Sequence, residues 1–125
     1  MLGATDPVMN EGSGMEIRPG LFVSKVDTEI WQPDTEVPGT DMHELVHHGK
    51  VWAGMTRVTG VSEPATWTPE QREVFLIIEG SVRIVFADGT DFELGVGDMA
   101  SIPAGMTTTW HIRTPFKEMW VLAED

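Results

Sequence analysis

One glutamate stands at the start of the most apolar run of this chain. Glu73 opens the segment EVFLII, in which only apolar residues follow it. Burial removes the hydration of a carboxylate and disfavours its ionised form, so a carboxyl group facing an apolar interior can exchange protons near neutral pH. Glu73 is therefore a candidate general acid or base, a metal ligand or a hydrogen-bond partner for a ligand. The structural alternative is a solvated Glu73 that pairs with Arg57 or Arg72.

Four histidines raise the question of a metal site. His43, His47 and His48 lie close together, and His111 lies nearer the C-terminus. Adjacent residues of a strand point to opposite faces, so at most one of His47 and His48 can face an interior site. Either His43 or His47 stays open as a metal ligand beside Glu73. His111 could complete that site, although a surface or interface position is the default for all four.

Large aromatic side chains could line a small-molecule pocket beside this carboxylate. Trp52, Trp67 and Trp110 are candidates for its walls. In the segment MTTTWHI, Trp110 has the same parity as Thr108, which places both on the inward side of a strand. Packing in the core is the alternative role of these rings. The predicted ligand-binding residues are Trp67, Phe75, Ile77, Phe86, Thr108 and Trp110.

Composition narrows the choice of partners. Twenty acidic residues against eight scattered basic ones give a formal net charge of -12, so neither nucleic acid nor an anionic membrane surface is an expected partner. The absence of cysteine excludes disulfides, thiolate chemistry and a cysteine-ligated zinc site. No run is long enough to span a bilayer, and the first residues lack the pattern of a secretion signal, so we expect a cytoplasmic protein.

Short strands and tight turns are expected to position these residues. The stretch from Glu73 to Gly105 consists of apolar runs separated by Glu79-Gly80, Asp88-Gly89 and Gly95-Val96-Gly97, a pattern that predicts a β-meander. Further strands are predicted at residues 21–26, 29–32, 44–48, 51–59, 106–113 and 116–122, with a short extended piece around Trp67 and a turn at Thr114-Pro115. No segment carries a helical stripe. The chain is therefore predicted to be all-β, with a closed or sandwich-like antiparallel architecture.

The length of 125 residues fits a single globular domain. Residues 1–16 are rich in small and acidic residues and show no periodicity, which is typical of a flexible arm. We therefore expect an N-terminal arm over residues 1–16 and one β-barrel domain over residues 17–125.

Alternation gives the strand that begins at Glu73 two apolar faces. Glu73, Phe75 and Ile77 share one face, whereas Val74 and Leu76 belong to the other. A strand of this kind must be covered on both sides, by the barrel interior on one and by a second sheet or another subunit on the other. A homodimer is therefore expected.

The spacing of one glutamate and several glycines resembles the two motifs of the cupin superfamily. Glu73 precedes Gly80 by the spacing of the first motif, and Gly97, Pro103 and Gly105 follow the spacing of the second. The chain is most similar to the small single-domain cupins grouped with ureidoglycine aminohydrolase and the ethanolamine-utilisation cupin. The resemblance covers residues 50–122 and implies a jelly-roll β-barrel. Its matching residues are Trp52, Glu73, Phe75, Gly80, Gly97, Asp98, Pro103, Gly105, Trp110 and Lys117.

The chain departs from the cupin pattern at the metal ligands. A metal-binding cupin uses three histidines and one glutamate, and of these only Glu73 is in place. The first two histidine positions fall on Trp67 and Pro69, or on Thr66 and Thr68 with the longer spacing of the motif. The third falls on Thr108, and His111 has the wrong parity to replace it. A degenerate metal site without a bound cofactor is therefore expected.

Two functions remain open. The first is a small-molecule-binding cupin that holds its ligand in the barrel pocket. The alternative is a metal-independent enzyme, of the lyase, isomerase, cyclase or hydrolase type, that uses Glu73 as general acid or base on a small metabolite.

Overall fold

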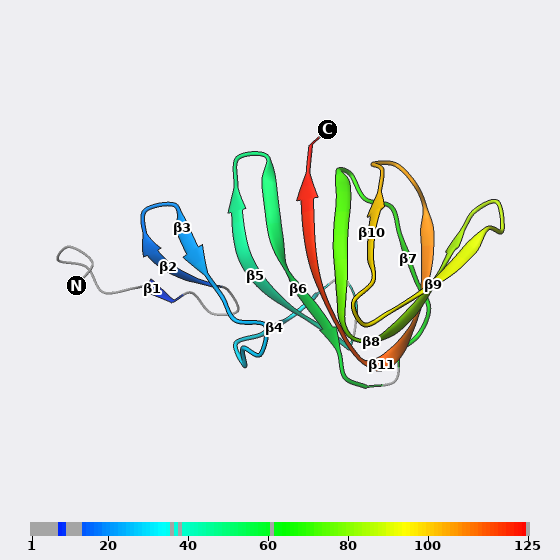
Figure 1. The fold of residues 1–125 in the computed structure, drawn as a ribbon, viewed down its shortest axis with the longest axis horizontal. Coiled ribbons are helices and arrows are strands. Elements are labelled where there is room, and N and C mark those ends of the chain that lie inside the picture. The colour runs from blue at the N-terminus through cyan, green and yellow to red at the C-terminus, as the bar shows by residue number, and fades with distance from the viewer. Residues whose placement is uncertain (1–7, 10–13, 36, 38, 61, 125) are drawn as a thin grey trace.

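The computed structural model describes residues 8–9, 14–35, 37, 39–60 and 62–124, and every regular element in that part of the chain is a β-strand (Figure 1). The strands are β1 (Val8–Met9), β2 (Met15–Arg18), β3 (Leu21–Val23), β4 (Gln32–Pro33), β5 (Thr40–His48), β6 (Val51–Val58), β7 (Ala65–Trp67), β8 (Arg72–Phe86), β9 (Asp91–Gly95), β10 (Met99–Ile102) and β11 (Thr108–Ala123). All their pairings are antiparallel, which confirms the predicted all-β antiparallel fold. Within these residues, none forms a helix long and apolar enough to cross a membrane.

Two long strands, β8 and β11, connect the walls of the jelly-roll barrel (Figure 1). The C-terminal half of β11 pairs with the N-terminal half of β8 and with β6. The N-terminal half of β11 pairs with the C-terminal half of β8 and with β7. On its other edge β8 pairs first with β10 and then with β9. Both walls therefore share the same two strands, and β5 and β4 extend the first wall beyond β6.

The two long strands correct two predicted turns. We expected the chain to reverse at Glu79-Gly80 and at Thr114-Pro115, but both places lie within continuous strands. Gly80 bends β8 with a φ of 78°, and the pairing register shifts between Arg113 and Lys117 on β11 beside it. Because the strands stay paired on both sides of these bends, neither bend closes a hairpin. The predicted hairpin at Asp88-Gly89 is confirmed, since β8 pairs with β9 across it. The continuation of the meander is wrong, since β10 pairs with β8 and not with β9.

Alternate residues of β8 and β11 fill the barrel interior. Phe75 and Ile77 are each 1% exposed, and their cross-strand partners on β11 are Trp120 and Glu118. Glu73 is 6% exposed on the same face, as its parity predicted. Each large apolar side chain buried here contributes roughly 1.5–3 kcal/mol to folding. The rest of the core consists of Val58, Val82, Ile84, Ile102, Trp110, Phe116 and Leu122.

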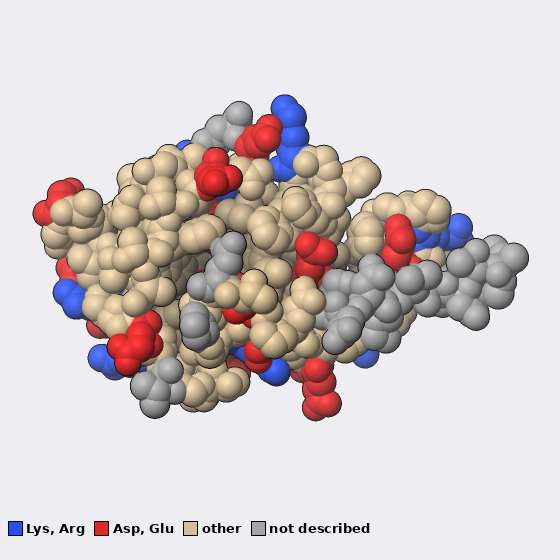
Figure 2. Space-filling model, turned by 180° about the vertical axis from the view of Figure 1, so that it is seen from behind, with Lys and Arg blue, Asp and Glu red and all other residues tan. Residues whose placement is uncertain are grey.

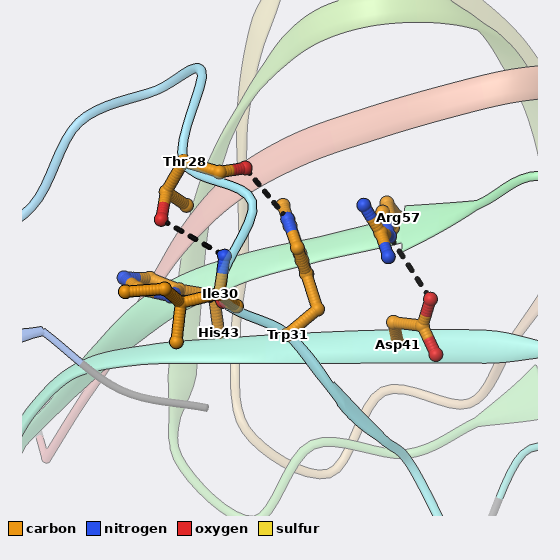
Figure 3. A network of polar contacts seen from close by, with 6 residues as sticks. All are labelled: Thr28, Ile30, Trp31, Asp41, His43 and Arg57. Carbon is orange, nitrogen blue, oxygen red and sulfur yellow. Dashed lines mark hydrogen bonds and ion pairs between the residues drawn. The ribbon is translucent and has the colours of Figure 1, made fainter. Parts of the chain in front are cut away.

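The segment over residues 14–35 contacts the outer face of β5 and β6 (Figure 3). His43 is 2% exposed there, with its Nδ1 2.6 Å from the carbonyl oxygen of Ile30 and its Nε2 2.7 Å from Ser24 Oγ. The ring centre of Trp31 lies 4.5 Å from the guanidinium carbon of Arg57. A cation–π contact and two hydrogen bonds to one imidazole therefore tie this segment to the barrel wall.

Part of the predicted N-terminal arm lies outside the described residues. Residues 1–7 and 10–13 belong to that part. Val8–Met9 pairs with Met15 and Glu16 of β2, and Gly14 is buried. The boundary between arm and domain at residue 17 stays a prediction.

The outer face of β8, β10 and β11 carries exposed apolar side chains, with Arg72 and Ser101 at one end. Met99 is 73% exposed and Val74 43% exposed, and Leu76, Ile78 and Val121 are half-buried. Met99 lies directly opposite Leu76 in the pairing of β10 with β8. The second apolar face predicted for this strand is therefore present.

The face of the molecule in Figure 2 carries no cluster of basic side chains among its described residues. Lys and Arg lie there at separate places, with Asp and Glu between them. Arg57 forms an ion pair with Asp41, and Arg83 forms one with Asp91.

Replacing Gly80 by alanine tests the bend in β8. A Cβ at Gly80 would run into the backbone oxygens of Arg113 and Pro115. Gly89 is a matched control, because its φ of 90° is similar and its added Cβ has no atom within 4 Å. We expect Gly89→Ala to reduce the free energy of unfolding by about 1–2 kcal/mol, the cost of the left-handed backbone, and Gly80→Ala to reduce it clearly more. Urea unfolding measures both, and equal losses would show that the bend tolerates a side chain.

A carboxyl pair as the candidate functional site

Two glutamates from the two long strands lie in the barrel interior. Glu73 comes from β8 and Glu118 from β11, and each is 6% exposed. Among the described residues, Oε1 of Glu73 and Oε2 of Glu118 have no hydrogen-bond partner. A buried carboxyl oxygen without a partner is costly, on the order of 1–3 kcal/mol or more, and such groups concentrate where proteins bind ligands or do chemistry.

The surroundings of the two carboxyl groups favour their protonated forms. Burial raises the pKa of Glu73 from its ordinary value of 4.5 to about 7, and a hydrogen bond from the Trp67 side chain opposes that rise. Burial also raises the pKa of Glu118 well above its usual range, and the charge of Glu73 raises it further. The pair therefore holds at least one proton near neutral pH and can accept or donate one.

A chain of hydrogen bonds leads from Glu73 to the neighbouring strand. The Nε1 of Trp110 donates to Thr108 Oγ1 at 2.8 Å, and Thr108 Oγ1 donates to the backbone oxygen of Trp67 at 3.1 Å. The Trp67 side chain donates in turn to Glu73. Strand pairing explains this arrangement, because Trp67 of β7 lies directly opposite Thr108 of β11. Three of the predicted pocket residues are thus connected to the predicted acid or base.

The other predicted pocket residues lie at different depths. The ring of Phe75 is 5.0 Å from that of Trp110, and Ile77 lies opposite Glu118 in the strand pairing. Phe86 is opposite Thr108, at the end of β8, where it lines a surface hollow of about 390 Å³ together with Met106 and Thr107. Phe75 and Ile77 therefore face the carboxyl pair, whereas Phe86 lies at the rim.

Sequence reasoning missed Glu118 and its polar neighbours. Thr56 lies opposite Glu118 on β6, and its Oγ1 accepts a hydrogen bond of 2.8 Å from Trp120 Nε1. The signal was present in the segment FKEMWVL, where Phe116, Glu118 and Trp120 share a parity. A glutamate between two aromatic residues on the inward face is the pattern of a buried carboxyl group.

The residues around this pair match a known family. Residues 57–119, about half of the chain, match the EutQ-like cupin domain. The chain belongs to the EutQ-like cupin family. The matched region includes both carboxyl groups and Thr108, and it confirms the resemblance to small single-domain cupins.

Solved cupin structures share the fold of the chain. The putative ethanolamine utilization protein Q of Salmonella typhimurium LT2 has a TM-score of 0.70 at 18% identity, over 97% of this chain and 98% of that protein. The Clostridium difficile EutQ protein has a TM-score of 0.63 at 21% identity, over 82% and 76%. The cupin domain of Schizosaccharomyces pombe Cnp3 has a TM-score of 0.69 at 14% identity, over 84% and 76%. No curated protein matches this chain. At these identities the likeness establishes the fold alone.

The positions of the cupin metal ligands do not fit a transition metal. Trp67 and Pro69 offer no ligand atom in their side chains, and the Thr108 hydroxyl is engaged by two hydrogen bonds. Within the described part of the chain, no three side chains of His, Asp or Glu gather into a set that could hold an ion.

The histidines do not rebuild such a site around Glu73. His43 lies on the outer face of β5, bonded to Ser24 and Ile30, which contradicts its predicted alternative role as a ligand. His47 is exposed and stacks on Trp52, with 4.6 Å between the ring centres. His48 and His111 are exposed. Period-2 alternation and the bulge between Glu44 and Val46 on β5 decide these directions.

The structure contradicts two parts of the structural alternative for Glu73, its exposure to solvent and its pairing with Arg57. Its suggested partner Arg57 pairs with Asp41 on the outer face of the wall, at 2.9 Å. Arg72 donates to Ser101 Oγ at 2.9 Å. Glu73 is buried and not solvated at the mouth, because its parity directs it into the interior.

The raised pKa of Glu73 makes the stability of the barrel depend on pH. Between its ordinary value of 4.5 and about 7, folded Glu73 keeps a proton that the unfolded chain has lost. The folded state then binds more protons, so the free energy of unfolding falls as the pH rises through this window, by roughly 3 kcal/mol for this group. Glu73→Gln removes that contribution, and the variant should gain stability relative to the natural protein from about pH 5 to about pH 8.

Urea unfolding across this pH range measures the difference. Glu63→Gln, a change at an exposed glutamate, is the control and should leave the pH profile unchanged. A difference between Glu73→Gln and the natural protein that does not vary with pH would contradict the raised pKa.

Proposed function

We propose that the barrel binds a small polar metabolite between the carboxyl pair and the aromatic walls. The observation that carries this proposal is the presence of two buried carboxyl groups, Glu73 and Glu118, each with one oxygen that has no partner among the described residues. A ligand with hydrogen-bond donors would satisfy both oxygens at once. The cost of leaving them unpaired in the free protein then favours binding.

The position of Trp67 supports access to this site. Its side chain reaches Glu73, yet the residue is 38% exposed, so it connects the interior to the solvent. Trp110 and Phe75 form the apolar wall farther inside. A similar structure is named a putative ethanolamine utilization protein, which agrees with a role in the metabolism of small polar molecules.

A second candidate function is metal-independent catalysis. The pKa of about 7 at Glu73 favours it, because a group that titrates near the working pH is the most effective general acid or base. Glu73 would take a proton from the bound molecule, and protonated Glu118 would donate one to an oxygen or nitrogen of the same molecule. The two carboxyl groups would then have opposite roles, set by their different surroundings.

Binding can be tested with a panel of small metabolites and the untagged protein. We expect at least one compound to raise the thermal midpoint of the natural protein, with the effect lost in both Glu73→Gln and Glu118→Gln. Glu63→Gln should keep the response. A midpoint that rises equally in the natural protein and in both barrel variants would place the ligand elsewhere.

The same compounds decide between binding and catalysis. NMR spectra of the compound after long incubation show whether it is recovered unchanged. Conversion by the natural protein that Glu73→Gln abolishes would favour the enzyme, whereas recovery of the unchanged compound would favour a binding protein.

We also propose that the chain forms a homodimer through the exposed apolar face of β8, β10 and β11. Met99 and Val74 are the most exposed apolar residues of this face, and exposed apolar surface favours association between proteins. A second copy of the same face is complementary to it, because apolar surfaces need no matching charges. The cytoplasmic location expected from the sequence stays a prediction.

Light scattering at micromolar concentration tests the dimer. The natural protein should have twice the mass of one chain, and Met99→Asp should reduce this to one. Val96→Asp, at a residue that is 68% exposed in the turn between β9 and β10, is the control and should remain dimeric. A natural protein with the mass of a single chain would refute the proposal.

A further inference from the structure

The chemistry of the carboxyl pair selects the kind of ligand. All eight basic residues lie in the described part of the chain, and none of them is buried. Lys117, the neighbour of Glu118 in the sequence, points to the opposite face and donates to the carbonyl oxygen of Val26 at 3.1 Å. No basic side chain of the protein therefore lies buried beside the two carboxyl groups. A positive charge that neutralises them must come from outside.

Several hydrogen-bond donors around the pair are already in use. The indole N–H groups of Trp67, Trp110 and Trp120 all donate to oxygens of the protein. The hydroxyl of Thr108 also donates, to a backbone oxygen. The groups left for a ligand include the two carboxyl oxygens, the hydroxyl of Thr56 and the faces of the aromatic rings. Acceptors and ring faces together favour a cation that carries N–H donors.

We propose that the ligand of this site is a small primary ammonium compound, an inference that rests on the proposed binding function. Three N–H donors fit one oxygen of Glu73, one oxygen of Glu118 and a hydroxyl such as that of Thr56, which lies opposite Glu118. The ring faces of Phe75 and Trp110 then contact its carbon atoms. A divalent ion such as Mg²⁺ or Ca²⁺ fits less well, since it takes six or more oxygen ligands and, among the described residues, two carboxyl groups converge here.

Binding of a cation also has a consequence for protons. A positive charge beside the pair favours the ionised carboxylates, so protons leave as the ligand enters, and affinity increases from about pH 6 to about pH 8. The burial that raises the pKa of Glu73 to about 7 places this release in the neutral range. Two further ionisable side chains share the inner face. They are Glu44 and His47 of β5, which lie beside Trp52.

Indole N–H signals in NMR spectra give a readout at known places. We would titrate the natural protein with propylammonium chloride, 1-propanol, sodium propionate or magnesium chloride. Propylammonium should shift the signals of Trp67 and Trp110 in a saturable way, and the signal of Trp31 on the outer face should stay in place. In Glu73→Gln and in Glu118→Gln the affinity should fall about tenfold or more, since each removes one charge-assisted hydrogen bond. Glu63→Gln should bind like the natural protein, and an unchanged Trp31 signal shows that each variant is folded.

The outcomes separate this inference from the proposed function. If propanol or propionate shifts the same signals with the same dependence on Glu73, the barrel binds small molecules but the ammonium inference is wrong. A response to magnesium without one to propylammonium assigns the pair to a metal and also overturns it. If the amine and both organic analogues leave Trp67 and Trp110 unshifted, the inference fails, and the proposed function fails as well if the metabolite panel gives no response that depends on the barrel glutamates.

Discussion

The burial of two carboxyl groups in one apolar interior is the constraint on which the site depends. Glu73 and Glu118 each lose their hydration, and the charge of one opposes ionisation of the other. The fold must supply that free energy through the apolar side chains packed around them, such as Phe75, Ile77 and Trp120. Costly buried charges of this kind are found at functional sites more often than at purely structural ones. The carboxyl pair is therefore the candidate site, and the surface hollow beside Phe86 is not.

The long strands β8 and β11 make that arrangement possible. Each contributes one glutamate, and their pairing on both sides of the bend at Gly80 holds the two inner faces toward each other. Hairpins at the expected turns would have separated Glu73 from Thr108 and Trp110. Continuous strands that bend together instead connect the first wall to the second, and they place the hydrogen-bonded chain of Trp110, Thr108 and Trp67 beside the carboxyl groups.

The barrel retains the cupin architecture with a different set of interior groups. Where metal-binding cupins have imidazoles, this chain has the indole of Trp67 and the hydroxyl of Thr108, and both are engaged in hydrogen bonds within the protein. Where the motif combines three imidazoles with one carboxylate, this interior has two carboxyl groups with aromatic neighbours. The proposed preference for an ammonium ligand rests on this combination of acidic oxygens and aromatic rings.

The local sequence determined the all-β class and the inward parity of Glu73, Phe75 and Thr108, because alternation is a local property. Only the tertiary structure decided that Glu118 joins Glu73 and that His43 is covered from outside by Ser24 and Ile30. It also decided that the chain continues through Gly80. The physical reason is that these outcomes depend on pairing between strands far apart in the chain, and such pairing overrides the turn preference of a glycine and brings together carboxyl groups that no spacing in the sequence relates.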